Sequence, residues 1–572
     1  MRQLLLGLAF LTALSAQSPD LILYNGKFVT LWDGHPQAQA VAIRAGRFLA
    51  VGSNEEVRRL AAASTRQTDL RGRTVLPGLI DSHTHPIGSA LSEQEEEIPV
   101  LHSLVDLQNH IARVAKASPP SKLIFVPKVY ATRMKEGRYP TRQELDRAGG
   151  AERLIVADNG YAAVLNTGAL KKAGITRDTP QPANGKIIKD ASGEPTGLLL
   201  GAPQLVASFR SNRLPADADR LWAIREMHKR YNEAGLTSTI DRSENPAGMR
   251  AYQELWQKGE LTVRTSVTML VNGSQPWDRL RAQILSLPNI TGFGDDWLRT
   301  GSLKIVLDGG ILIGTAYMRE PYGEHTEVYG FHDPEYRGVL AVPQENIFEM
   351  ARLSNQLGWQ MTAHTTGGAS TDLLLDAYEA ADKERPIRDR RFTLTHANFP
   401  NRSVIERSKR MGVVLDMQPA WLHLDGAALS KVLGPQRMLD FQPYKSLFDA
   451  GLVVAGGSDH MIKFDSRDAI NPFNPFFGMW MAVTRRLTDG SVLAPEQRIT
   501  REQALRMWTL HAAYASLEET RKGSIEPGKL ADLVVISADF LTCPEDEIRN
   551  LAAEATMVGG RFVYTRRSFD PR

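Results

Sequence analysis

Two histidines stand one residue apart in the segment "LPGLIDSHTHP", which runs from Leu76 to Pro86. Side chains at positions i and i+2 of a β-strand point to the same face. His83 and His85 would therefore converge if the apolar run before them is a strand. Two converging imidazoles suit a first-row divalent metal ion, zinc above all. An isolated pair of this kind also fits two hydrogen-bonded surface histidines, so the rest of the chain must decide between the two interpretations.

Three further polar residues end short apolar runs much later in the chain. His364 ends "WQMTAH", His396 ends "FTLTH" and Asp459 ends "LVVAGGSD", whose small residues would let the backbone pack closely before the carboxylate. In a barrel of parallel strands, residues at the C-terminal ends of different strands converge on one mouth. Four imidazoles and one carboxylate at that mouth would form a ligand set for one or two divalent metal ions.

A lysine lies inside another apolar run, "SLKIVLDGG". Burying the charged amine of Lys304 there would be costly unless the amine had a partner. One interpretation is that the side chain extends to the surface. The other is that its amine reacts with carbon dioxide to give a carbamate, whose negative charge would bridge two metal ions. The sequence leaves both open.

A fold in which strands and helices alternate would bring these residues together. Between residues 76 and 520, about eight short apolar runs alternate with helix-like amphipathic stretches, which predicts a (β/α)8 TIM barrel of the α/β class. A segment at about 87–215 interrupts the alternation after the first strand and is predicted to be an insertion. Residues 18–75 and 521–572 show short alternating strands with turns such as "NG" and "AG". We expect both ends to form one flanking β-sandwich.

The N-terminal segment, residues 1–17, has the layout of a secretory signal peptide. Arg2 precedes an apolar stretch, residues 4–14, and small residues follow it. This stretch is shorter than the roughly 18 apolar residues of a membrane span. A buried N-terminal helix is the alternative. We therefore expect an exported protein, periplasmic or extracellular, that has no membrane attachment after cleavage.

The charge and cysteine content of the chain argue against several classes of function. Lysine and arginine total 68 against 65 aspartate and glutamate, a formal charge of +3, and no long basic run supports a nucleic-acid partner. The single cysteine excludes an intramolecular disulfide framework and a cysteine-rich metal site. A serine or cysteine nucleophile is a weaker rival, because no G-x-S-x-G occurs at a strand-to-helix turn. A small-molecule substrate is the expected partner, and a homodimer is left open.

The quoted segments together resemble the amidohydrolase superfamily. "LPGLIDSHTHP", "KIVLDGG", "GSD" and "KGSIEPGKLADLVVI" carry the likeness. "PTRQELDRA" and "GEPTGLLL" bring it closer to the amidohydrolase-3 branch, which includes the N-substituted formamide deformylases. The resemblance covers nearly the whole chain after residue 17, and it implies a metal-bearing barrel with zinc as the expected ion. The ligand positions that it implies are His83, His85, Lys304, His364, His396 and Asp459, with Lys304 carboxylated in two-metal members.

The activity that the resemblance implies is metal-dependent hydrolysis of a C–N bond of the amide type, other than a peptide bond. The metal would activate water, and Asp459 would accept the proton of that water and deliver it to the leaving amine. The candidate substrate contacts are Tyr161, Arg242, Trp421 and His423. For the last three, a packing or surface role fits the sequence equally well.

The chain departs from the family pattern at two places. It has "NGY" at Asn159 to Tyr161 where members often have "DGH", and "HTTGG" at His364 to Gly368 where they tend to have "HAIGD". Both departures are expected to border the substrate, so deformylase activity does not carry over directly. The alternatives are hydrolysis of an ester, lactam or dipeptide on the same metal site, and a barrel that binds a small molecule without turnover.

Overall fold

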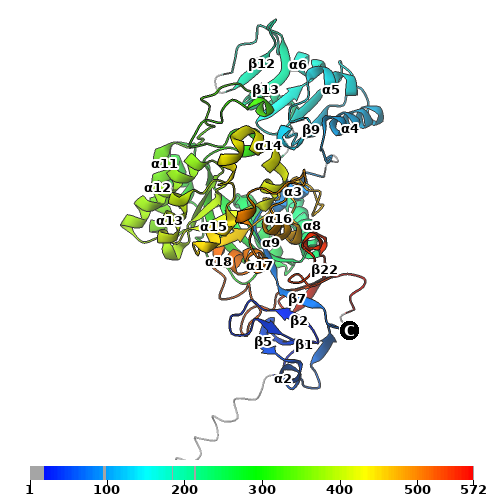
Figure 1. The fold of residues 1–572 in the computed structure, drawn as a ribbon, viewed down its shortest axis with the longest axis vertical. Helices are drawn as coiled ribbons and strands as arrows, with labels where there is room; N and C mark the ends of the chain where they lie inside the picture. Colours follow the sequence, from blue (N-terminus) through cyan, green and yellow to red (C-terminus); the bar gives the residue numbers. More distant parts are fainter. Residues whose placement is uncertain (1–17, 95–97, 183–184, 211–213, 571–572) are drawn as a thin grey trace, which may run out of the picture.

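The structure is a computed structural model of the 572-residue chain, and it describes residues 18–94, 98–182, 185–210 and 214–570. The predicted signal peptide at 1–17 lies outside the described residues. A central barrel lies between two smaller parts, the insertion at one end and sheets from both chain termini at the other (Figure 1). No helix in the described ranges is long and apolar enough to cross a membrane.

Eight strands form the central sheet, and every neighbouring pair in it is parallel. A parallel bridge between Thr84 and His460 brings the two edges together, so the barrel is nearly closed. This confirms the predicted (β/α)8 barrel. In spatial order the strands are β8 (Leu79–Thr84), β14 (Leu236–Glu244), β15 (Arg264–Leu270), β16 (Leu298–Val306), β17 (Met361–Thr365), β18 (Thr393–His396), β19 (Val414–Met417) and β20 (Val454–Gly456).

Helices follow the barrel strands and cover them, and the sequence sets several of their ends. Asn401 caps α13 by accepting a hydrogen bond from the Val404 amide, and Gly412 ends it in the left-handed conformation. The helices are α3 (Pro86–Leu91), α8 (Asp217–Glu233), α9 (Pro246–Gln257), α10 (Trp277–Leu285), α11 (Gln344–Leu357), α12 (Gly368–Glu384), α13 (Arg402–Met411), α14 (Pro419–Met438), α15 (Tyr444–Asp449), α16 (Pro475–Thr484), α17 (Arg501–Met507) and α18 (Leu510–Ala515).

The insertion predicted after the first barrel strand lies between β8 and β14, and it forms a sheet of its own, which the sequence did not indicate. Its strands, in spatial order, are β12 (Lys186–Lys189), β13 (Pro195–Leu200), β11 (Ala162–Leu165), β10 (Ile155–Asp158) and β9 (Ile124–Pro127). Its helices are α4 (Leu104–Ala117), α5 (Arg142–Gly149), α6 (Thr167–Ala173) and α7 (Pro203–Val206). A short turn, η1 (Ala131–Arg133), leaves this sheet and contacts α14 and the segment after β16.

The two chain ends share a pair of packed sheets. The first sheet contains β5 (Arg47–Gly52), β4 (Ala40–Arg44), β1 (Leu21–Tyr24) and β6 (Arg66–Asp69), beside α2 (Asn54–Arg58). The second contains β23 (Arg561–Thr565), β22 (Ala553–Val558), β21 (Leu533–Ile536), β7 (Thr74–Pro77), β2 (Lys27–Val29) and β3 (Gln37–Ala38). Antiparallel pairing of β7 with β21 joins the two termini, and one apolar cluster that includes Leu23, Val41 and Val535 lies between the sheets.

Candidate metal centre

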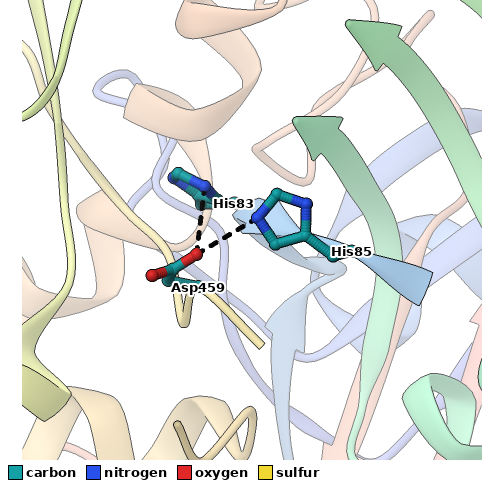
Figure 2. Close-up of side chains that lie close together, drawn as sticks. All are labelled: His83, His85 and Asp459. Carbon is teal, nitrogen blue, oxygen red and sulfur yellow. Dashed lines mark hydrogen bonds and ion pairs between the residues drawn. The ribbon is translucent and has the colours of Figure 1, made fainter. Parts of the chain in front are cut away.

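Three of the predicted ligands meet where the two edge strands of the barrel come together. His83 lies in β8, His85 directly follows that strand, and Asp459 follows β20. Asp459 Oδ1 lies 3.3 Å from His83 Nε2 and 3.2 Å from His85 Nε2. Figure 2 shows both imidazoles directed at this carboxylate. One ligand atom from each residue lies within 4.8 Å of the others, which is compact enough to hold one metal ion.

The other two histidines lie beside this group. His396 Nε2 is 2.9 Å from His364 Nδ1, and the ring centroid of His396 is 5.0 Å from that of His83. On its other side, His364 Nε2 is 3.4 Å from the carbonyl oxygen of Gly309. The structure therefore brings together all four histidines that the sequence placed at strand ends.

Lys304 lies in β16, with only 4% of its surface exposed. Its side chain therefore does not extend to the surface. Its positive charge contributes to lowering the pKa values of His83, His364 and His396. Burial lowers the pKa of the Lys304 amine itself to about 8.

The electrostatics of the donors suit a divalent cation. Burial lowers the pKa values of His83 and His396 well below the ordinary value and that of His364 to about 4, which favours the neutral imidazole that binds metals. Burial alone would raise the pKa of Asp459, but His83, His85 and Lys304 outweigh it, and the pKa lies below its ordinary value. His83 Nε2 is buried and has no hydrogen-bond partner among the described residues. A metal ion would satisfy that nitrogen.

Asp416, a buried carboxylate on β19, contacts His83 at Nδ1, the ring nitrogen that does not face Asp459. Its Oδ2 lies 3.2 Å from His83 Nδ1, and its Oδ1 accepts hydrogen bonds from Ser82 Oγ at 2.7 Å and from Gln418 Nε2 at 3.1 Å. A carboxylate on the distal nitrogen fixes the tautomer that leaves Nε2 free for a metal. Asp416 was not among the residues predicted from the sequence, although a carboxylate inside the apolar run "VVLDMQP" was a usable signal.

Gln418 and Trp421 fix the position of His396. Gln418 Oε1 lies 2.6 Å from His396 Nδ1. The His396 ring is stacked between His83 and Trp421, with centroid distances of 5.0 and 4.5 Å. Trp421 is buried, and its indole N–H has no hydrogen-bond partner in the described part of the chain. Trp421 thus lies at the site, and its contact with substrate stays a prediction.

The other three predicted substrate contacts, Arg242, His423 and Tyr161, lie in three different environments. Arg242 is fully buried and its Nε lies 2.9 Å from the Ser82 carbonyl and 3.1 Å from Asp416, which favours a positioning role. His423 Nδ1 lies 2.6 Å from the Arg486 carbonyl oxygen, and its ring packs on α16, which favours a packing role. Tyr161 is partly buried between β10 and β11, and its role in substrate binding also stays a prediction.

Close backbone approach positions the ligands, as the small residues before Asp459 suggested. Asp459 and His396 have φ angles of 55° and 74°, in the left-handed region that few non-glycine residues adopt, although aspartate and histidine tolerate it better than most. Gly457 leaves no room for a side chain, because a Cβ atom there would lie 2.7 Å from His83 Cβ.

Gly457→Ala is therefore expected to lower the free energy of unfolding by about 1–3 kcal/mol, the usual cost of overpacking. Urea denaturation would measure the change. Gly88→Ala is the matched control, because Gly88 is exposed in α3 and a Cβ atom there meets nothing within 4 Å. If both variants had the same stability, the close approach of β20 to β8 would not be a constraint.

Comparisons with known proteins agree with this fold. The model of the amidohydrolase family matches residues 66–564. The N-substituted formamide deformylase of Arthrobacter pascens is 29% identical over 562 residues, which cover 96% of this chain and 99% of that protein. An uncharacterized metal-dependent hydrolase from Pyrococcus horikoshii OT3 has a TM-score of 0.67 and 22% identity, over 92% of this chain and 99% of that one. The atrazine chlorohydrolase TrzN from Arthrobacter aurescens TC1, complexed with zinc, has a TM-score of 0.52 and 16% identity, over 95% of each chain.

Proposed function

The chain belongs to the amidohydrolase family, and from this we propose that it is a metal-dependent hydrolase that cleaves a C–N bond of the amide type other than a peptide bond. The observation that carries the proposal is the convergence of His83, His85 and Asp459, within which His83 Nε2 is buried without a hydrogen-bond partner. The full-length likeness to a formamide deformylase supports the amide class.

We propose one or two divalent ions, zinc above all, as the cofactor. When bound, such an ion acidifies water and polarises the scissile carbonyl group. Two structural neighbours, a metal-dependent hydrolase and a chlorohydrolase complexed with zinc, support this choice. The residues that would hold the ions are His83, His85, Lys304, His364, His396 and Asp459.

The lysine would take part as a carbamate. Because burial lowers the pKa of Lys304 to about 8, more of its amine is neutral at physiological pH. The neutral nitrogen attacks the carbon of carbon dioxide, a C–N bond forms, and the nitrogen loses a proton. The product carries a negative charge that offsets the cost of burying the amine and adds two oxygen donors.

Asp459 would be the proton carrier. Its carboxylate is ionised, because its pKa lies below the ordinary value, and one oxygen faces both His83 and His85. It accepts the proton of the attacking water and then delivers it to the leaving nitrogen. Asp416, through its contact with His83 Nδ1, keeps that imidazole oriented while charge redistributes.

We further propose that the substrate is a small molecule that Tyr161 and Trp421 contact, and that the protein acts outside the cytoplasm. The apolar N-terminal stretch supports export. An ester, lactam or dipeptide on the same metal site is the second candidate, since the two departures from the family pattern leave the substrate open.

Purified protein is expected to contain one or two zinc ions per chain. Elemental analysis would measure them, and a screen of amides, formamides, lactams, dipeptides and esters would identify the substrate. A chelator should abolish turnover and added zinc should restore it. Protein that is free of metal and turns over substrate in a chelator would refute the proposal, whereas bound zinc with no turnover of any substrate class would favour a binding protein.

A further inference from the structure

A short turn of the insertion, η1 (Ala131–Arg133), lies between loops at the barrel mouth. Thr132 Oγ1 donates a hydrogen bond to Asp425 Oδ1 at 3.1 Å. Arg133 forms a two-pronged pair with the same carboxylate, with Nε 3.0 Å from Oδ1 and Nη2 2.9 Å from Oδ2. Asp425 lies in α14 and is fully buried. The insertion is therefore anchored to the helix that follows β19.

The same guanidinium also holds the loop that follows β20, residues 460–474. Arg133 Nη1 donates to the carbonyl oxygen of Ile470 at 2.5 Å, and Nη2 donates to Asn471 Oδ1 at 3.2 Å. Asn471 is 2% exposed. Because an arginine can only donate, the oxygen of the Asn471 amide must face Arg133, and its NH2 group must face the opposite way.

That NH2 group reaches Asp459. Asn471 Nδ2 donates to the carbonyl oxygen of Asp459 at 2.8 Å and lies 3.5 Å from the carboxylate oxygen Oδ2. The other carboxylate oxygen, Oδ1, is the one that faces His83 and His85. Asn471 thus contacts Asp459 on the side away from the histidines, and it holds a backbone whose φ angle of 55° is uncommon.

We propose that Asn471 is a positioning residue for Asp459, and that Arg133 connects it to the insertion, so that the insertion forms part of the catalytic centre. Through this connection, the segment between β8 and β14 sets the direction of a carboxylate that lies more than 300 residues later in the chain. The inference rests on the proposed function, because it takes Asp459 to be a metal ligand.

Zinc affinity tests the inference without any substrate. Metal-free protein competes for zinc with a chromophoric chelator, and Asn471→Ala is expected to bind zinc about 10–100-fold more weakly than the wild type, as when an outer-shell partner of a ligand is lost. Arg133 keeps its Asp425 partner in this variant, so no buried charge is left unpaired.

Asn474→Ala is the matched control. Asn474 is buried in the same loop and caps α16 through the Phe477 amide, at 3.1 Å, and no hydrogen bond within the described residues joins it to Asp459. Its loss should lower the melting temperature and leave zinc affinity within about twofold of the wild type, since a cap contributes stability only. If both alanine variants lost the same zinc affinity, loop stability would explain the effect and the inference would be wrong.

A double variant tests the connection to the insertion. Arg133→Met combined with Asp425→Asn removes the cation without leaving a buried carboxylate unpaired. Because this variant removes one positive and one negative charge of the same ion pair, the net charge near Asp459 does not change. Zinc binding that is about 10-fold weaker would therefore show that Arg133 acts by positioning Asn471 and not through its charge. Unchanged or stronger binding would overturn the role of Arg133.

The two proposals fail in different ways. Wild-type protein that binds no zinc refutes the metal site and the inference together. Wild-type protein that binds zinc, with Asn471→Ala within twofold of it, refutes the inference alone. With a substrate in hand, Asn471→Ala at full zinc occupancy should lower kcat with KM within about twofold, because Asn471 acts through Asp459 and does not touch substrate.

Discussion

Lys304→Ala is expected to lose at least one bound metal ion per chain and to reduce turnover by more than the roughly 10–100-fold that an outer-shell partner costs. Lys304 is buried in β16, its charge acts on the pKa values of His83, His364 and His396, and as a carbamate it would supply two oxygen donors in place of a charged amine. Metal content by elemental analysis and turnover of the screened substrate would measure the loss. Short carboxylic acids should restore part of both, because they can occupy the space and supply the missing oxygens.

Lys522 is the matched control for that rescue. It is equally buried, but it pairs with Glu518 and donates to Ser238 Oγ at 3.0 Å, outside the metal centre. Lys522→Ala should lower the free energy of unfolding, because it leaves the buried carboxylate of Glu518 without its partner. Added carboxylic acids should not reverse this loss. Lys304→Ala with full metal content, or a crystal structure with an unmodified Lys304 amine beside the metal ions, would contradict the carbamate.

The barrel and the convergence of polar residues at its strand ends were predictable because both depend on local features of the sequence. Short strands such as β18, β19 and β20 are buried on both faces, and His364, His396 and Asp459 stand at or just after the ends of their strands. In parallel strands, position at the strand end is enough to predict convergence. The alternating pattern of the chain ends likewise predicted two packed sheets.

A buried carboxylate such as Asp416 could have been noticed in the sequence, but which histidine it contacts was not predictable, because the two residues come from distant parts of the chain. Asp416 contacts His83 across a separation of 333 residues, and nothing near either residue indicates the other. Arg242 was a candidate substrate contact, although a packing or surface role fitted the sequence equally well. Its partner, Asp416, lies on a strand far along the barrel sheet. The alternation of apolar and polar residues indicates which face of the sheet a side chain occupies, but it does not indicate which side chain from another strand it contacts.

Asp459→Asn is expected to retain most of its metal and to lose about 10²–10⁴-fold in turnover, the usual cost of removing a general base. Asparagine has nearly the same size and keeps one oxygen toward His83 and His85, so the geometry at 3.2–3.3 Å should persist. It cannot accept a proton at neutral pH, whereas the Asp459 carboxylate is ionised because its neighbours hold its pKa below the ordinary value.

Turnover at matched metal occupancy is the measurement that decides this role. Asp468→Asn is the control, since Asp468 is an exposed carboxylate on the same loop, and its turnover should equal that of the wild type. KM should change little in Asp459→Asn, because the proton carrier acts on water and on the leaving nitrogen rather than on the bound carbonyl group. Near-wild-type turnover in a fully loaded Asp459→Asn variant would mean that another group carries the proton. Asp416 is fully buried against Arg242 and Ser82 and is not placed to take over that role, so that outcome would require a different mechanism.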